Sequence, residues 1–157
     1  MQNGSRHFAG LEIGLNHTVP VVVANAAARF GKKPYCISES GVVTTFADLS
    51  ARVEGFGADL LRRGVRFGDR IVVLAPNSVE WIIAALGAMS IGAIMVPINT
   101  RFKGPEVRHV LETSRAAIVC TVGSFLGVDY PAMIVTACGG AEQGRPAAEL
   151  PPLRAIV

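Results

Sequence analysis

The feature that most constrains the fold is a series of three short apolar runs separated by two segments with helical spacing. The runs are Arg70 to Ala75, Ala93 to Ile98 and Ala116 to Val122, and the intervening segments are Asn77 to Ile91 and Pro105 to Ser114. Near-continuous apolar strands are typical of a parallel sheet that is covered on both faces. Strands that alternate with helices at these spacings predict βαβ units. The sequence therefore predicts an α/β fold, a partial three-layer sandwich with a mainly parallel sheet.

The two intervening segments carry start signals of their own. Asn77 precedes the first, with Glu80 three residues later, so we expect Asn77 to be its N-cap. Gly104 and Pro105 begin the second, since proline is tolerated in the first helical turn. The helical and strand spacings predict a buried core that contains Phe46, Leu49, Val53, Val73, Leu74, Ile82, Leu86, Val96, Val110, Leu111 and Ile118.

Two helices and a hairpin are expected before the sheet. An Ala-rich helix covers Val19 to Phe30, with Thr18 as its N-cap. A short hairpin pairs Tyr35 to Ser38 with Val42 to Thr44 around a glycine turn. Residues 1–17, which precede the first helix, are interpreted as a flexible N-terminal arm, and residues 18–157 as one incomplete domain.

The second helix has the clearest boundaries in the chain. Thr45 and Asp48 form a near capping box at its start. Gly64 is expected to end it in the left-handed conformation, with Val65 folding back onto Leu60 or its neighbour. Beyond the sheet the pattern weakens. There we expect a helix over Tyr130 to Cys138, a surface loop over 139–152 and a further strand over 153–157.

Composition bounds the class of protein. The chain has 157 residues, of which 50% are hydrophobic and 17% charged, so it is globular and not disordered, collagenous or a coiled coil. Its 15 basic residues exceed its 12 acidic ones by three but form no stripe, so nucleic-acid binding is not indicated. Three cysteines without a paired spacing indicate no disulfide framework, and a reducing cytoplasm fits best.

One segment raises the question of a membrane. Trp81 to Ile98 is an uncharged run of 18 residues, the threshold length for a transmembrane helix. Gly87, Gly92 and Pro97 interrupt it, which favours a helix followed by a strand. We therefore expect no transmembrane span and a cytoplasmic protein, with peripheral contact with a membrane left open. A small membrane protein built on this segment is the least favoured alternative.

Histidine and cysteine side chains are the first candidates for chemistry, and they form no set. His109 is expected to be solvated on a helix, without the further ligands that a metal site needs, and the other two histidines lie in the N-terminal arm. Cys36 and Cys120 lie in expected strands and are interpreted as buried apolar side chains, which leaves Cys138 as the exposed thiol. The glycine-rich segment 139–144 lacks the Lys and hydroxyls of a phosphate-binding loop. We assign no catalytic, cofactor-binding or metal-binding residue.

Several motifs in order resemble a known family. Thr45 to Leu49 resembles its first core motif, usually Thr-Tyr-x-Glu-Leu, and Arg62 to Val65 resembles the end of the helix that follows. Gly68-Asp69-Arg70 and Pro76-Asn77-Ser78 match turns beside the next strand, and Ile91 to Asn99 resembles the second core motif, usually Ala-Gly-x-x-x-Val-Pro-Leu-Asn. From about Thr18 to the last residue, the chain is thus similar to the opening part of the N-terminal domain of the AMP-forming acyl-CoA synthetases.

The resemblance implies a reaction and the cofactors for it. The family uses ATP and Mg²⁺ to convert a carboxylic acid to an acyl-adenylate, then transfers the acyl group to coenzyme A. Asp129-Tyr130-Pro131 after Phe125-Leu126-Gly127 indicates, more weakly, a fatty-acyl branch. The family's Ser/Thr/Gly-rich loop ending in Lys, its ribose contact and its C-terminal catalytic Lys all lie further along a longer chain. We therefore expect a truncated or split fatty-acid-type synthetase that is inactive alone and holds no cofactor by itself.

An alternative of a different class stays open. The chain could be a non-catalytic module that retains the scaffold and binds an acyl group, coenzyme A or another protein. The candidate partners are the missing C-terminal portion and a related full-length synthetase, with fatty acid or coenzyme A bound weakly if at all.

Overall fold

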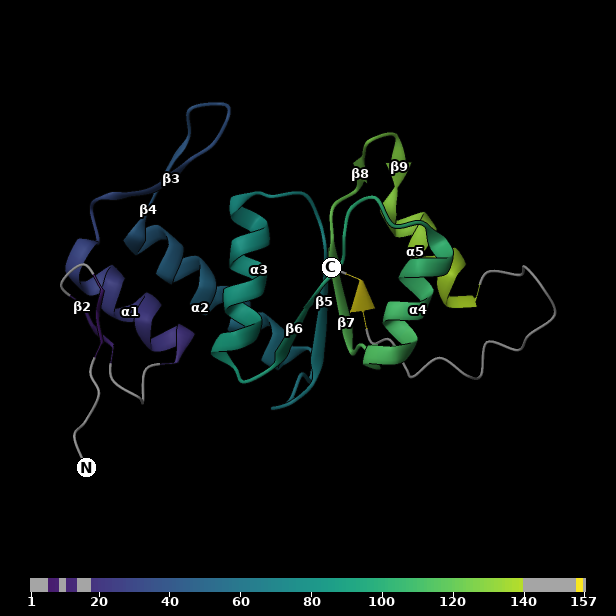
Figure 1. Ribbon diagram of the computed structural model, residues 1–157, viewed down its shortest axis with the longest axis horizontal. Helices are drawn as coiled ribbons and strands as arrows, with labels where there is room; N and C mark the ends of the chain where they lie inside the picture. Colours follow the sequence, from purple (N-terminus) through teal and green to yellow (C-terminus); the bar gives the residue numbers. More distant parts are fainter. Residues whose placement is uncertain (1–5, 9–10, 14–17, 140–154, 157) are drawn as a thin grey trace. The chain divides into compact units, whose positions relative to one another are not determined.

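The computed structural model describes residues 6–8, 11–13, 18–139 and 155–156 (Figure 1). The chain divides into two compact units, Met1–Ala51 and Arg52–Val157, and the division falls inside one helix. Each unit is described by itself.

The first unit contains two antiparallel strand pairs and a helix. Its elements are β1 (Arg6–Phe8), β2 (Leu11–Ile13), α1 (Val19–Phe30), β3 (Pro34–Ile37), β4 (Val43–Thr45) and the beginning of α2 (Phe46–Arg62). The β3–β4 hairpin and both helices confirm the expectation, whereas the pairing of β1 with β2 was not predicted. Gly41 makes the hairpin turn with a φ of 81°, a conformation in which a Cβ is disfavoured.

The second unit contains the predicted parallel sheet. Its elements after α2 are β5 (Arg70–Leu74), α3 (Val79–Ser90), β6 (Ile94–Pro97), α4 (Gly104–Ser114), β7 (Ile118–Thr121), β8 (Ser124–Phe125), β9 (Val128–Asp129), α5 (Tyr130–Gly139) and β10 (Ala155–Ile156). The strand order is β10-β7-β5-β6, and every pairing within this sheet is parallel. The fold is therefore the α/β arrangement that the apolar runs predict, and β10 lies in the expected last strand.

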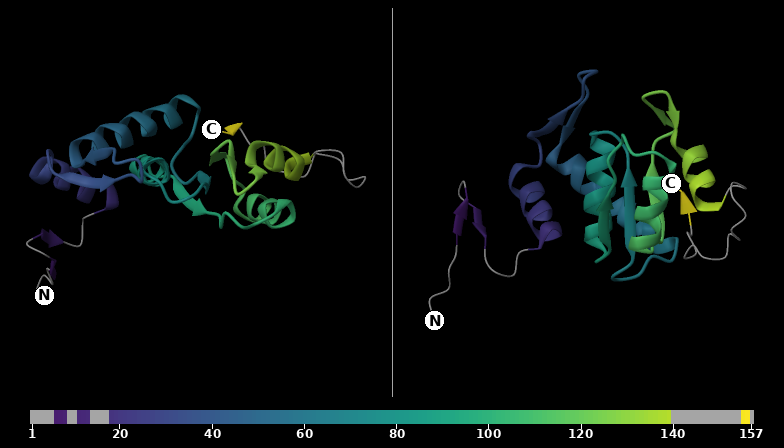
Figure 2. Two further views of the ribbon diagram at one scale, coloured as in Figure 1. Left: turned by 90° about the horizontal axis from the view of Figure 1, so that it is seen from above. Right: turned by 45° about the vertical axis from the view of Figure 1, so that its right-hand side comes forward.

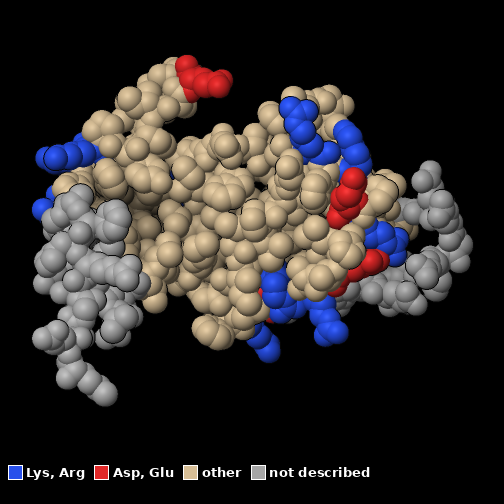
Figure 3. Space-filling model, in the orientation of Figure 1, with Lys and Arg blue, Asp and Glu red and all other residues tan. Residues whose placement is uncertain are grey.

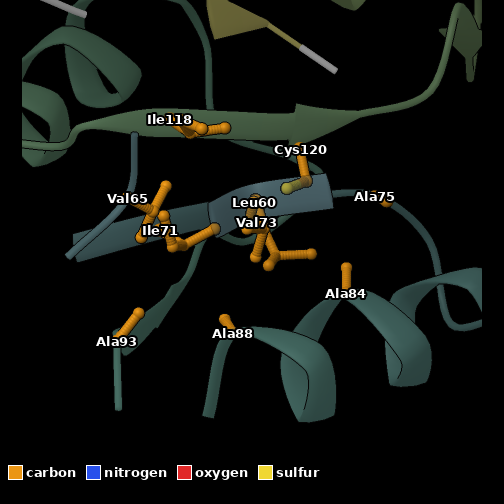
Figure 4. Packing of buried hydrophobic residues seen from close by; sticks show 10 residues of the cluster. All are labelled: Leu60, Val65, Ile71, Val73, Ala75, Ala84, Ala88, Ala93, Ile118 and Cys120. Atoms are coloured by element: carbon orange, nitrogen blue, oxygen red, sulfur yellow. The ribbon is translucent and has the colours of Figure 1, made fainter. Parts of the chain in front are cut away.

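Helices cover both faces of this sheet. Figure 2 shows α3 on one side of the strands and α4 with α5 on the other. On the α3 face, Ile71 and Val73 of β5 pack with Ile118 and Cys120 of β7 (Figure 4). Small side chains let α3 approach, among them Ala84 and Ala88. The α4 and α5 face instead uses larger side chains, and its buried residues include Val72, Leu74, Val107, Leu111, Tyr130 and Ile134.

Glycine sets the contact between α2 and α3. A Cβ on Gly87 would lie 2.7 Å from the ring of Phe56 and 3.3 Å from the Val53 carbonyl oxygen. A Cβ on Gly57 would lie 2.7 Å from Ser90 Oγ. A Cβ at Gly87 would therefore have to displace the Phe56 ring, and one at Gly57 the Ser90 hydroxyl, so both glycines favour the close packing of the two helices.

The predicted ends of α2 are confirmed. The Thr45 N–H donates to Asp48 Oδ2 at 3.1 Å, and the Asp48 N–H donates to Thr45 Oγ1 at 3.1 Å, so the capping box is complete. Gly64 has a φ of 81°, and the Val65 N–H donates to the Leu60 carbonyl at 3.1 Å. Val65 and Leu60 are both buried in the same cluster.

The predicted start of α3 was wrong by one residue. The N-cap is Ser78 and not Asn77, because Ser78 Oγ accepts the Trp81 N–H at 3.2 Å. Glu80 falls in the first turn and pairs with Arg52 on α2 at 2.9 Å. The exposed side chain of Asn77 is left at the end of β5.

The predicted core was partly correct. Leu49, Val53, Val73, Leu74, Leu111 and Ile118 are buried, while Phe46, Ile82, Leu86, Val96 and Val110 are half-buried. On α3 the sheet cluster contains Ala84 and Ala88, and Gly87 packs against α2, so Ile82 and Leu86 are left half-buried. Trp81 to Ile98 divides into α3 and β6, which rules out one unbroken helix there. Among the described residues, no helix is long and apolar enough to cross a membrane.

Candidate functional site

The carboxyl ends of β5, β6 and β7 lie at one edge of the sheet. The segment after β5 leads into α3 on one face, whereas the segments after β6 and β7 lead to α4 and α5 on the other face. Where successive connections leave a parallel sheet in opposite directions, a crevice opens outside the strand ends, and α/β proteins bind ligands there. This edge is therefore the candidate site.

A cavity of about 530 Å³ lies at this edge. We call it the carboxyl-end pocket. Its walls come from the ends of β5 and β6, the first turn of α3 and strand β8, and they comprise Ala75, Pro76, Asn77, Trp81, Pro97, Ile98, Asn99, Thr100 and Phe125. None of these residues is charged, two are aromatic and two carry side-chain amides. The pocket thus offers flat apolar surfaces and neutral hydrogen-bonding groups.

A tight turn after β6 forms the polar wall of the pocket. Asn99 Oδ1 accepts the Arg101 N–H at 2.9 Å, and the Asn99 carbonyl accepts the Phe102 N–H at 3.0 Å. Such Asx turns fix the backbone through a local side chain. The carbonyl of Thr100, inside this turn, accepts the Tyr130 hydroxyl at 2.8 Å. The turn is therefore held both from within and from α5.

A second, smaller cavity lies on the α3 face of the sheet. It measures about 270 Å³, and its largely apolar lining includes Phe56, Val73, Trp81, Cys120 and Val122. We call it the apolar groove. Arg52 and Glu80 also line it, and Arg52 holds the pKa of the Glu80 carboxyl below its usual range, mainly through their hydrogen bond. Burial raises the pKa of the Cys120 thiol to about 11. The thiol is therefore neutral at physiological pH, which agrees with its interpretation as an apolar side chain.

The structure places the other sequence candidates apart from this site. His109 is exposed on α4, as expected. Cys138, expected as the exposed thiol, is instead half-buried in α5, and burial raises its pKa. The prediction failed because α5 packs Cys138 against the buried cluster on the α4 and α5 face, a contact that the local sequence does not reveal. Among the described residues, no group of His, Cys, Asp and Glu could hold a metal ion. Segment 140–144 lies outside them.

Sequence reasoning missed the pocket, although a signal for it exists. Pro76-Asn77 follows β5, and Pro97-Ile98-Asn99 ends β6 and follows it. A proline at or just after the strand end, followed within two residues by an amide side chain, recurs on two neighbouring parallel strands. Because the carboxyl ends of parallel strands share one edge, this repetition brings both amides to the same cavity.

Charge on the visible surface is mixed. On the face drawn in Figure 3, side chains of both signs lie over the part of the second unit that contains α4. Arg108 and Glu112 form one such pair on α4, at 2.7 Å. Ion pairs this exposed contribute little to stability.

The comparisons identify the family. The chain matches the family of AMP-binding enzymes over residues 23–153. It is 38% identical over 112 residues to a 7a-methyl-1,5-dioxo-octahydroindenyl-propanoyl:CoA ligase of Rhodococcus jostii, covering 71% of this chain and 22% of that protein. It is 38% identical over 85 residues to the long-chain-fatty-acid–CoA ligase FadD13 of Mycobacterium tuberculosis, covering 54% of this chain and 17% of that protein. The chain thus spans about a fifth of the length of these curated relatives.

Solved structures give the same result. The anthranilate CoA ligase AuaEII, in complex with anthranoyl-AMP, superposes with a TM-score of 0.76 at 26% identity, over 92% of this chain and 25% of that one. The N-terminal domain of FACL13 from Mycobacterium tuberculosis superposes with a TM-score of 0.74 at 26% identity, over 90% of this chain and 33% of that domain. The described fold is therefore that of part of the N-terminal domain of adenylate-forming enzymes.

Proposed function

The chain belongs to the AMP-binding enzyme family, and we propose that it is the opening part of a fatty-acid-type acyl-CoA ligase, inactive by itself. In this proposal, the carboxyl-end pocket accepts the adenine base of ATP or of coenzyme A. The phosphates, the metal ion and the acyl group bind to residues that this chain does not supply.

The observation that carries the base-binding role is the uncharged lining of the carboxyl-end pocket. A planar base with ring nitrogens fits between aromatic side chains and amides such as Asn77 and Asn99, because it needs flat apolar surface and neutral donors and acceptors. A triphosphate needs cations, backbone N–H groups or a metal ion opposite its charge. The pocket therefore suits the base and not the phosphates.

The positions of the lysines support inactivity. The lysines of the chain are Lys32, Lys33 and Lys103, and none lies in a Ser/Thr/Gly-rich loop. Adenylation stabilises charge that develops around phosphorus, and each preorganised group that does so is worth orders of magnitude in rate. Without these groups, any binding of nucleotide or acyl group by this chain would be non-productive.

Pyrophosphate exchange tests this proposal. The purified chain should show no fatty-acid-dependent exchange between ATP and pyrophosphate above a no-protein control. Activity that appears only when the C-terminal portion of a related acyl-CoA ligase is added in trans would support a split enzyme. Exchange by the chain alone, surviving removal of contaminating full-length ligase, would refute the proposal.

A non-catalytic interaction module is the second candidate, favoured by apolar side chains on the β3–β4 hairpin. Ile37 is 65% exposed and Val42 62% exposed. Exposed apolar patches of this kind mark interaction surfaces or favour aggregation. The fragment proposal predicts that the expressed chain is poorly soluble alone. Its solubility should increase when it is co-expressed with the C-terminal portion of a related acyl-CoA ligase. A sharp monomeric peak with cooperative thermal unfolding would instead favour the self-sufficient module.

A further inference from the structure

We propose that Tyr130 is a positioning residue for the carboxyl-end pocket. Its hydroxyl and its ring each contact a residue that lines the pocket. The inference rests on the proposed base-binding role of this pocket. The walls in question are Thr100, in the turn after β6, and Phe125, on β8.

The position of Tyr130 within the fold is fixed. It is the first residue of α5 and only 1% exposed, and it packs in the cluster on the α4 and α5 face of the sheet. Its N–H donates to the Gly123 carbonyl at 3.1 Å, across the base of the β8–β9 hairpin. The ring therefore has little freedom to move independently of the sheet.

Two contacts run from this fixed ring to the pocket. The hydroxyl donates to the Thr100 carbonyl at 2.8 Å, a link across 30 residues of sequence. The ring lies against that of Phe125, with centroids 6.5 Å apart and planes inclined by 52°. Thr100 and Phe125 come from different connections, and Tyr130 contacts both of them.

The chemistry of the contact suits a permanent link. A carbonyl oxygen can only accept, so the Tyr130 hydroxyl must keep its proton to hold it. Burial raises the pKa of this hydroxyl, which keeps it protonated across the neutral range. A phenylalanine here would keep the packing and the contact with Phe125 but release the Thr100 carbonyl.

Tyr130→Phe separates the two roles of the residue. If the hydroxyl positions the turn, the Arg101 and Phe102 amides, which donate within it, should exchange with solvent about 3- to 10-fold faster in the variant. The Val72 amide in β5 should exchange as in the wild-type chain. The matched control is Tyr35→Phe, the same change at the other tyrosine of the chain, which should leave the turn unaltered.

Binding provides the second readout. Trp81 is the single tryptophan and lines the pocket, so its fluorescence should report titration with AMP. Tyr130→Phe should weaken AMP binding about 3- to 10-fold, and Tyr35→Phe should not. Equal acceleration of exchange at Val72, or unchanged exchange at the turn, would overturn the positioning role, as would AMP binding equal to wild type.

The two proposals can fail separately. If the wild-type chain gives no response to AMP, the base-binding role fails. The exchange experiment still decides whether Tyr130 holds the turn: acceleration confined to Arg101 and Phe102 supports it, and any other pattern overturns it.

Discussion

The two ends of the parallel sheet differ in how they use their polar groups. At the amino end, the Arg70 guanidinium donates to the carbonyls of Ser114 at 2.6 Å, Gly68 at 3.0 Å and Arg115 at 2.8 Å. The ring of Phe67 occupies the place that a Cβ would take on Gly92. At the carboxyl end, the same strands open into a cavity of about 530 Å³.

This difference separates stability from function along the same strands. The Arg70 side chain donates to carbonyls 44 and 45 residues away in the sequence. Its hydrogen-bond donors at the amino end are therefore used within the protein. The carboxyl end instead leaves amide side chains and aromatic rings facing the cavity, where a ligand can meet them. Substitutions at the amino end should therefore alter unfolding, and substitutions at the carboxyl end should alter binding.

The largest expected effect follows the loss of the Arg70 hydrogen bonds. Arg70→Met should lower the free energy of unfolding by about 2–3 kcal/mol, because hydrogen bonds to charged groups are the stronger ones and three carbonyls lose a donor. Urea denaturation measures this change. Arg66→Met is the control, since Arg66 is exposed and lies four residues before Arg70. If Arg70→Met lost AMP binding without losing stability, the claim that the amino end serves stability and the carboxyl end serves binding would be contradicted.

An effect of similar size, confined to high pH, is expected at Cys120, in the interior between the ends. Its native pKa of about 11 exceeds the ordinary value of 9.0, so the unfolded chain releases this proton first. The contribution to stability is fully present below pH 9 and is lost as the pH rises through about 11, by about 2–3 kcal/mol. Wild type and Cys120→Ala should therefore differ in the pH dependence of unfolding, measured under reducing conditions. Parallel pH profiles for the two proteins would contradict the burial of this thiol.

The smallest expected effect on stability comes from Ser78, and it distinguishes this residue from the neighbouring Asn77 at the start of α3. Ser78→Ala should cost about 1 kcal/mol, because it removes the cap on the Trp81 N–H. Asn77→Ala should leave unfolding almost unchanged but weaken the response to AMP, because Asn77 lines the pocket and does not cap the helix. A loss of stability in Asn77→Ala, with none in Ser78→Ala, would instead show that Asn77 is the N-cap.

The sequence predicted the elements of the sheet well and the site poorly. Ile71 to Leu74 could be recognised as a buried strand because apolar burial on both faces leaves a local pattern. The contact of Tyr130 with Thr100 has no such pattern, since it joins residues 30 positions apart through the fold. The choice between Asn77 and Ser78 likewise depended on backbone geometry, because both residue types cap helices equally well.

The most direct test follows backbone amide shifts during titration with AMP. The account predicts saturable shifts at the carboxyl end, at Asn77, Asn99, Thr100 and Phe125, and none at Gly68 or Gly92 at the amino end. Ribose 5-phosphate, which lacks the base, should leave all of them unchanged. Shifts at the amino end, equal shifts with ribose 5-phosphate, or no shifts at the carboxyl end would contradict the account.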